Sequence, residues 1–409
     1  MKIAIIGAGV VGVTTAYMLA KIGHEVTVFD REPRAAMESS FANGGQLSYG
    51  FASPMGTPGL LGKVPSILFG ADPAFRLPST LSFDFMKWSL QFLRHCQPGQ
   101  SQIDAEQLAA LAQQSGTVFR QILSETSFDF GHRKANKLVL LKSAKDLEKA
   151  AAPTPKSIER VYREVLPWKD CLQREPALRN YNGEVAGGVW IEGDEVGDAA
   201  RFSEQMVAFC EKAFDVQFSF NTNIVGVSAK EQGPQELSLS TGEILTFDSV
   251  VVCTGVAGTK LLQALDIRLP IYPVMGYSLT APLGSNPPQV AVTDAGYKIV
   301  FSRIGDQIRI AGFADFGIAS EERRRQRVQD LIRTVRQLIP DVADYSRIES
   351  TWIGARPATP SSLPIVGQSK VPGIYLNMGH GMFGWTLSAG AAQNLADLIG
   401  PATRASRAA

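Results

Sequence analysis

The chain has 409 residues, of which 45% are hydrophobic, and this supplies enough apolar material for one large or two intertwined domains with buried cores. Its 40 Lys and Arg nearly balance its 39 Asp and Glu, so no overall charge would hold it on nucleic acid or on an anionic membrane. Four dispersed cysteines without a CxxC pair, together with only four histidines, argue against a disulfide framework or a metal site.

Residues 1–30 predict a βαβ unit. Residues 3–6 are a short apolar run, residues 13–22 have helical apolar spacing, and residues 25–29 alternate as a strand does. The apolar start is too short and too interrupted by glycine for a signal peptide, and no run of about 18 uncharged apolar residues follows. We therefore expect a cytoplasmic protein.

The next two hundred or so residues are less regular. Residues 50–80 are rich in Gly, Pro and Leu and predict a long irregular loop. Helical spacing returns over residues 82–125, and the region from there to about residue 200 is predicted to be mostly helical with a strand pair. Residues 216–258 are predicted as strands, and they end in FDSVVVCTGVAG, which is typical of a buried parallel strand that re-enters the first sheet.

The C-terminal part has a different pattern. Residues 271–316 alternate strongly, which predicts an antiparallel sheet in a second, substrate-side domain. Residues 321–340 predict an amphipathic helix whose arginine run faces solvent. The segment GIYLNMGHGMFG then leads from a strand into a helix over residues 385–399.

The glycine motif GAGVVG lies between the first predicted strand and helix, which is the context of a dinucleotide-binding fingerprint. Gly7 permits the tight turn, Gly9 lets the backbone approach a pyrophosphate, and Gly12 lets the helix pack on the strand. The helix N-terminus then faces the phosphates. Asp30 ends the second strand, where its carboxylate accepts hydrogen bonds from the adenosine ribose. The alternative is an ordinary glycine-rich turn.

Two further glycine turns favour FAD over NAD. One is CTG, which ends at Gly255, and the other is GHGMFG at residues 379–384. A cofactor that touches three distant segments is a long one, and Asp30 would repel a 2′-phosphate. The predicted fold is α/β, a Rossmann-type FAD-binding domain with an interleaved α+β substrate domain that carries a mixed or antiparallel sheet. We assign residues 1–50, 200–262 and 350–400 to the FAD-binding domain, and residues 51–199 and 263–349 to the substrate-binding domain with its helical excursion.

Segments along nearly the whole chain are similar to one flavoprotein family. They are GAGVVG with VFDR, SSFANGGQLSYGFASP, IYPVMGYSLT, GYKIVFSRIGDQIRIAGFADFG, WIGARPATPSSLPIVG and NMGHGMFGWTLSAGAAQNLADLI. Together they resemble the FAD-dependent D-amino acid dehydrogenases of the D-amino acid oxidase and glycine oxidase superfamily. The C-terminal motifs are the more specific ones, because many flavoproteins share the N-terminal glycine motif.

The resemblance implies further contacts to FAD. The C-terminal glycine turn would run beside the pyrimidine edge of the flavin, with the positive end of the last helix facing N1 and the C2 carbonyl. The residues implied there are Gly381, Gly384, Trp385 and Thr386. The other residues implied to contact the cofactor are Arg31, Ser39, Ser40, Asn43, Gln46 and Ile224.

The resemblance also implies a substrate site. Arg356 in GARPATP matches the arginine that relatives use to hold the substrate carboxylate, and Tyr297 in GYKIV matches a tyrosine beside it. A planar guanidinium binds both carboxylate oxygens and so fixes the Cα hydrogen over the flavin. The alternatives are a structural salt bridge for Arg356 and a half-buried strand tyrosine for Tyr297. His380 is interpreted as a packed, satisfied histidine.

The implied reaction is the oxidation of a small amino acid by noncovalently bound FAD, with hydride transfer from Cα to flavin N5 and electrons passed to a quinone or another acceptor. The substrate is a D-amino acid or a cyclic imino acid such as proline or hydroxyproline; Met275, where many relatives carry lysine, suits a neutral side chain. The apolar loop 51–70 either covers the site or lies against the inner membrane. Two alternatives stay open: an oxygen-using oxidase, and an FAD-carrying non-catalytic subunit of an oxidoreductase complex.

Overall fold

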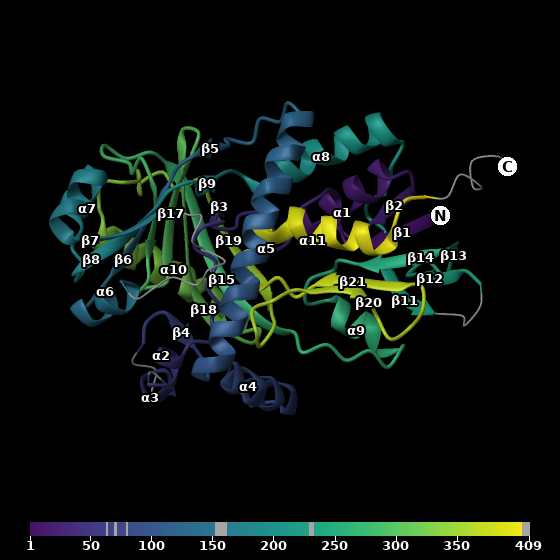
Figure 1. Ribbon diagram of the computed structural model, residues 1–409, viewed down its shortest axis with the longest axis horizontal. Helices are drawn as coiled ribbons and strands as arrows, with labels where there is room; N and C mark the ends of the chain where they lie inside the picture. Colours follow the sequence, from purple (N-terminus) through teal and green to yellow (C-terminus); the bar gives the residue numbers. More distant parts are fainter. Residues whose placement is uncertain (63, 69–71, 79–80, 152–161, 229–232, 403–409) are drawn as a thin grey trace.

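The computed structural model describes residues 1–62, 64–68, 72–78, 81–151, 162–228 and 233–402. Two large sheets of different construction lie side by side (Figure 1). In this view the long helix α5 (Pro98–Glu125) crosses the boundary between them, and it packs against the C-terminal helix α11 (Gly384–Ile399). Parts of the predicted loop (63, 69–71 and 79–80), of the mixed region (152–161) and of the strand region (229–232) lie outside the described residues.

The first sheet has six strands in the order β10-β2-β1-β14-β21-β20. Neighbouring strands are parallel, except that β20 is antiparallel to β21. Ile6 pairs with Phe29 and with Val252, so the carboxyl ends of three parallel strands meet at one edge. This confirms the predicted return of the chain to its first sheet. The strands are β1 (Lys2–Ile6), β2 (Glu25–Phe29), β10 (Gln217–Ser219), β14 (Ser249–Val252), β20 (Ile365–Gln368) and β21 (Ile374–Met378).

Both faces of this sheet are covered, which explains its nearly continuous apolar strands. Ile3 and Ile5 point into one core cluster, with the helices, while Ala4 and Ile6 point into another, because side chains alternate along a strand. The helices on the first face are α1 (Val10–Lys21), α8 (Ala199–Phe214) and α11. The second face carries β11 (Ile224–Ser228), β12 (Gln235–Leu239), β13 (Ile244–Phe247) and α9 (Gly258–Gln263).

The second sheet has nine strands in the order β19-β15-β18-β17-β16-β6-β8-β7, with β4 paired to β18. It is mixed: β6 is parallel to β16 and β4 to β18, and the other pairs are antiparallel. Helix α10 (Glu321–Leu338) packs against β15 and β19. The strands are β4 (Phe75–Arg76), β6 (Lys137–Leu141), β7 (Arg163–Pro167), β8 (Gly187–Ile191), β15 (Tyr272–Pro282), β16 (Ala291–Asp294), β17 (Ile299–Ile304), β18 (Gln307–Phe316) and β19 (Ser350–Ala358).

The structure confirms the predicted fold class and the antiparallel strands over residues 271–316, but it corrects the region before residue 200. That region was predicted to be mostly helical with one strand pair, whereas it supplies β6, β7 and β8 to the large sheet. Short apolar runs such as KLVLL and GGVWI cannot be assigned by periodicity alone. Its other elements are β5 (Arg133–Lys134), α6 (Ala144–Ala150), α7 (Trp168–Arg174), the 3₁₀ helix η2 (Pro176–Asn180) and β9 (Glu195–Val196), which joins β5 and β3 (Gln46–Leu47) in a small sheet.

The predicted helical excursion is present and more regular than expected. The loop at residues 50–80 contains the short helices α2 (Pro58–Leu61) and α3 (Val64–Leu68), and α4 (Phe83–His95) follows it. The division of the chain into two domains stays a prediction. Strand β19 belongs to the large sheet, although the predicted boundary groups it with the FAD-binding segments.

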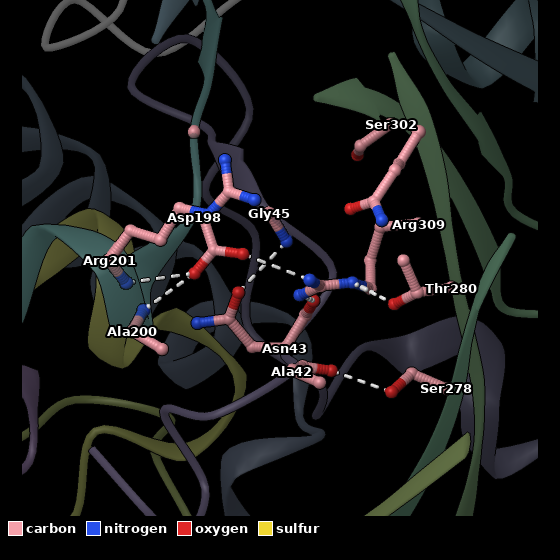
Figure 2. A network of polar contacts seen from close by, with 12 residues as sticks. Ala42, Asn43, Gly45, Asp198, Ala200, Arg201, Ser278, Thr280, Ser302 and Arg309 are labelled. Carbon is pink, nitrogen blue, oxygen red and sulfur yellow. Dashed lines mark hydrogen bonds and ion pairs between the residues drawn. The ribbon is translucent and has the colours of Figure 1, made fainter. Parts of the chain in front are cut away.

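A buried ion pair ties helix α8 to the large sheet (Figure 2). Asp198 Oδ1 accepts hydrogen bonds from the backbone N–H of Ala200 and Arg201 at 2.9 and 3.1 Å, which caps the helix. Its Oδ2 accepts a hydrogen bond of 2.9 Å from Arg309 Nη2, and Arg309 Nε donates to Thr280 Oγ1 at 2.7 Å. Both charged residues are only 7% exposed, so the pair is shielded from solvent.

The same sheet holds the chain at residues 42–44 through its backbone carbonyl groups (Figure 2). Ser278 and Ser302 each donate a hydroxyl hydrogen bond of 2.6 Å, and Arg309 Nη1 donates one of 3.4 Å. These residues belong to the segment predicted to contact the cofactor, so the large sheet fixes the position of that segment.

We predict that Arg309→Met lowers the free energy of unfolding by about 3 to 5 kcal/mol, because it leaves the Asp198 charge buried without its partner. Urea titration measures the loss. Arg325→Met is the control: it breaks an exposed pair with Glu321 on α10 and should lower the stability by less than about 1 kcal/mol. Equal losses in the two variants would contradict the prediction.

Candidate active site

A cavity of about 1970 Å³ lies between the two large sheets. One side is formed by the turns after β1 and β14 and by the start of α11, and the other by residues of β15, β18 and β19. Sites for small molecules usually enclose about 300 to 1000 Å³. The cavity is therefore large enough for an extended cofactor together with a small substrate.

The predicted glycine turn has the geometry of a nucleotide-binding loop. Gly7 has a φ of +106°, and a Cβ there would lie 2.9 Å from the carbonyl oxygen of Cys253. A Cβ on Gly12 would lie 1.8 Å from the Gly7 oxygen, so this glycine allows α1 to pack on its strand and does not itself line the cavity. Gly7 and Gly9 line it, at the N-terminus of α1.

Asp30 lines the same end and holds the glycine turn in place. Its Oδ2 accepts a hydrogen bond of 2.6 Å from Ala8 N, and its Oδ1 accepts one of 2.9 Å from Glu32 N. Burial raises the pKa of this carboxyl group, and the two backbone hydrogen bonds act in the opposite direction. Arg31 lies beside it at the cavity and forms an ion pair with Glu38.

The segment with Ser39, Ser40, Asn43 and Gln46 lines the cavity as expected. Ser40 Oγ accepts a hydrogen bond of 3.1 Å from Val10 N at the start of α1. Ser39 Oγ donates to Ala355 O at 2.7 Å, and Gln46 Nε2 donates to Val292 O at 3.2 Å. Asn43 Oδ1 accepts from the backbone of the same loop. Several side chains of this segment therefore fix its shape through hydrogen bonds within the protein.

The start of α11 forms another part of the wall, with Gly381, Gly384, Trp385 and Thr386. This 16-residue helix has no side-chain cap at its N-terminus, so its first N–H groups are open to an electronegative ligand atom. The Trp385 indole is buried and donates to Gly197 O at 3.2 Å, which leaves its backbone for a ligand. Ile224 and Gly255 line the cavity as well.

Four residues of the wall carry buried polar atoms without a hydrogen-bond partner among the described residues: Thr254 Oγ1, Trp352 Nε1, Asn377 Oδ1 and His380 Nε2. Buried polar groups in folded proteins almost always have partners. Their presence in the wall fits a cavity that receives a polar ligand. Burial lowers the pKa of His380 to about 3, so its imidazole is neutral. His380 is packed in the protein as interpreted from the sequence, but its Nε2 has no hydrogen-bond partner among the described residues.

Arg356 lines the cavity from strand β19. Its Nη1 donates to the carbonyl oxygen of Phe313 at 2.8 Å, and a Cβ on Gly276 would lie 2.2 Å from its Nη2. No carboxylate of the described part of the chain lies within 4.0 Å of the guanidinium, so the alternative of a structural salt bridge is not formed there. Burial lowers the pKa of Arg356, and the Asp315 carboxylate acts against this.

Asp315, the carboxylate whose charge acts on Arg356, already has other hydrogen-bond partners. Asp315 accepts two hydrogen bonds from Arg327, of 2.8 and 2.9 Å, and one of 2.9 Å from the hydroxyl of Tyr277. Phe313, which accepts from Arg356, has a φ of +63° where the register of β15 against β18 shifts. A bulge of this kind turns a backbone group out of the ladder. Here it provides an acceptor for Arg356.

Two expected substrate-side residues lie elsewhere. Tyr297 is not part of the cavity wall: it is half-buried against the core of the large sheet, and its backbone N–H donates to Asp294 Oδ1 at 2.8 Å. The structure thus does not bring it to Arg356, whereas Tyr277 lines the cavity. Met275 is 3% exposed in the same core and is also absent from the wall. Residues 51, 53–55 and 57–60 of the apolar loop do line the cavity.

A charged group that the sequence reasoning missed lies in the wall formed by β6 and β7. Lys137 is 4% exposed, and its Nζ donates to Ser48 Oγ at 2.6 Å and lies 3.9 Å from Asp194 Oδ2. Arg163 of β7 also lines the cavity. The only signal in the sequence is a lysine at the head of an apolar strand, KLVLL, because its partners are distant along the chain.

The described residues contain no group of three or more His, Cys, Asp or Glu side chains that could hold a metal ion. All four cysteines are free and buried. Within the same residues, none of the helices is both long and apolar enough to span a bilayer.

Comparison with known proteins identifies the family. Residues 2–398 match the model of the DAO family of FAD-dependent oxidoreductases, and the chain belongs to this family. A D-amino acid dehydrogenase of Rhizobium johnstonii is 37% identical over 404 residues, which cover 98% of this chain and 96% of the relative. The resemblance inferred from the sequence is therefore confirmed: the protein is an FAD-dependent oxidoreductase similar to D-amino acid dehydrogenases.

Solved structures agree in fold. Glycine oxidase from Bacillus cereus superposes with a TM-score of 0.70 at 20% identity and covers 97% of this chain and 94% of that one. The L-alpha-glycerophosphate oxidase from Mycoplasma pneumoniae, solved with FAD bound, gives a TM-score of 0.71 at 16% identity, with 97% and 94% covered. The glycine turn, Asp30 and the uncapped start of α11 fit the FAD that this family uses.

We predict that Asp30→Ala raises the Kd for FAD at least tenfold, because the glycine turn loses a charged acceptor and the adenosine end loses a carboxylate; hydrogen bonds to charged groups contribute about 1.5 to 3 kcal/mol. Fluorescence titration of the apoprotein with FAD measures the Kd. Asp248→Ala is a matched control: this exposed carboxylate accepts from Lys2 N at 2.7 Å, outside the cavity. An FAD affinity that is unchanged in Asp30→Ala would refute the assignment.

Proposed function

We propose that the protein oxidatively deaminates a small D-amino acid or a cyclic imino acid such as proline or hydroxyproline. The observation that carries the proposal is the guanidinium of Arg356, which faces the cavity and has no carboxylate partner among the described residues. The similarity to D-amino acid dehydrogenases supports the same reaction class.

Arg356 binds the substrate carboxylate. Its Nη1 is anchored by Phe313 O, and the absence of a side chain on Gly276 makes room for the guanidinium against the sheet. A guanidinium in a fixed plane binds both carboxylate oxygens and orients the Cα–H bond. A salt bridge inside the protein would have competed with this contact, and Arg327 together with Tyr277 keeps Asp315 from forming one.

FAD, when bound, would supply the oxidising power for removing a hydride from Cα of the neutral amine. Water would then hydrolyse the imine product, which would release ammonia from an amino acid but would only open the ring of a cyclic imino acid. The chain's own residues orient Cα and limit the access of water. FAD binding is noncovalent in this proposal. Burial raises the pKa of the Cys253 thiol, which lines the cavity, to about 12, so it is a poor nucleophile at neutral pH.

The electron acceptor is a quinone or another redox partner, reached through peripheral contact with the inner membrane. Helix α4 lies with α2 and α3 along the lower edge of the molecule in Figure 1. It exposes an apolar row on one face, and Lys87 and Arg94 are exposed beside that row. The row consists of Phe83, Met86, Leu90 and Leu93, which are 75%, 47%, 63% and 38% exposed. Apolar and basic residues combined in this way suit an anionic lipid surface.

We predict that the FAD-loaded protein is bleached anaerobically by D-amino acids or cyclic imino acids, and that Arg356→Ala keeps its FAD but loses about 30- to 1000-fold in kcat/KM. One charge-assisted bidentate contact is worth about 2 to 4 kcal/mol. Gly276→Ala, which displaces the guanidinium and keeps its charge, should act in the same direction. Arg303→Ala, which lies in the same sheet but outside the cavity wall, should leave kcat/KM unchanged.

The proposal fails if no amino or imino acid bleaches the loaded protein, or if Arg356→Ala leaves kcat/KM unchanged. A peroxide assay during aerobic turnover separates the acceptors. Stoichiometric peroxide would identify an oxidase, and its absence with reduction of an added quinone would identify a dehydrogenase.

We predict that the protein sediments with vesicles that contain anionic lipid, and that Phe83→Ser combined with Leu90→Ser abolishes this binding because it removes the most exposed apolar side chains of α4. Vesicles of zwitterionic lipid alone should bind less, because Lys87 and Arg94 then lack counter-charges. As a control, Ile244→Ser changes an apolar residue that is 60% exposed on β13, far from α4 in Figure 1. Equal binding of the double variant and the unchanged protein would exclude this surface.

A further inference from the structure

Lys137 connects to the start of helix α11 through hydrogen bonds. Its Nζ donates to Ser48 Oγ at 2.6 Å, and the backbone N–H of Ser48 donates to Thr386 Oγ1 at 3.0 Å. Thr386 lies in the first turn of α11, and all three residues line the cavity. The ammonium group is thus linked by one serine to the uncapped helix end.

The surroundings of Lys137 leave its positive charge incompletely balanced. The carboxylate nearest to it within the described residues, Asp194, lies 3.9 Å away, and that Oδ2 accepts no hydrogen bond there. Burial raises the pKa of Asp194 to about 6. The hydrogen bond of the ammonium group goes instead to a neutral hydroxyl.

A second cation shares this environment. Lys137 and Arg163 both pair with Ile191 of β8 from opposite sides, so their side chains leave the same face of the sheet. Their charged groups lie 5.5 and 5.8 Å from the centre of the same ring, that of Phe51. Two cations accompany one carboxylate, so this part of the wall carries net positive charge when Asp194 is ionised.

We propose that Lys137 is a positioning residue for the flavin: its buried ammonium, acting through Ser48, stabilises the negative charge that reduction places on the pyrimidine edge. The inference rests on the part of the proposed function that puts this edge at the start of α11. A positive charge near N1 is one of the means by which a protein raises the potential of a bound flavin. Here it adds to the positive end of the helix.

A lysine with a purely structural role would satisfy Asp194 and would not affect the cofactor. The geometry points the other way, because the ion pair with Asp194 is long, at 3.9 Å, whereas the ammonium donates its hydrogen bond of 2.6 Å to Ser48. The place of Lys137 in the sheet also argues against a role in holding the carboxylate that Arg356 binds. Five strand-to-strand steps separate β6 from β19, which is roughly 24 Å at about 4.8 Å a step.

The midpoint potential of bound FAD, measured anaerobically against reference dyes, tests the inference without any amino acid substrate. Lys137→Met and Lys137→Gln should both lower the potential by at least about 30 mV, a tenfold change in the two-electron equilibrium. Lys137→Gln keeps a donor for Ser48 and removes only the charge, so it decides the case if Lys137→Met does not fold. Lys137→Arg keeps the charge, so its bound FAD should have the same midpoint potential as in the unchanged protein.

Lys142→Met is the matched control, because Lys142 also lines the cavity but is exposed and paired with Glu184 at 2.8 Å. The midpoint potential of FAD bound to Lys142→Met should equal that of FAD bound to the unchanged protein. An unchanged potential in Lys137→Gln with FAD bound would overturn the inference and leave the deamination proposal intact. If the potential shifts as predicted but no amino acid bleaches the protein, the inference stands and the deamination proposal fails.

Discussion

The charge of Arg356 is kept in a cavity wall where no carboxylate of the described residues neutralises it. A buried or half-buried guanidinium is normally paired, because its removal from water is otherwise unfavourable. The fold maintains the exception in three ways: the strained backbone at Phe313 offers a carbonyl, Gly276 makes room, and Arg327 occupies Asp315. A carboxylate that enters the cavity completes the missing pair.

The remainder of the fold brings the elements that we assign to the cofactor to the same cavity. The parallel sheet brings its glycine turn and Asp30 to one end of the cavity, and α11 brings an uncapped helix start to another part of it. The loop at residues 42–44 is held by the large sheet through Ser278, Ser302 and Arg309. The loop that we assign to the cofactor is thus hydrogen-bonded to the sheet that carries Arg356, and a buried ion pair joins Asp198 to Arg309 of that sheet.

The parts of the site that depend on short sequence spacing could be predicted from the sequence. The glycine turn and Asp30 lie within one βαβ unit, and the resemblance placed Arg356 and the C-terminal turn at the cavity. Positions that depend on strand register could not be predicted, since a shift of one residue moves a side chain to the other face. Tyr297 lies in the turn between β16 and β17 and outside the cavity wall, which the resemblance did not reveal. Lys137 was missed because Ser48 is 89 positions away in the chain. Strands β6 to β8 were misassigned because their apolar runs are too short to show a period.

A crystal structure of the FAD-loaded protein with an unreactive carboxylate analogue of a cyclic imino acid would test whether Arg356 binds the substrate. We expect both carboxylate oxygens to lie on the guanidinium of Arg356, with the ring carbon next to the carboxylate facing the flavin. A carboxylate bound instead between Lys137 and Arg163, or an Arg356 side chain turned away from the ligand, would contradict this expectation.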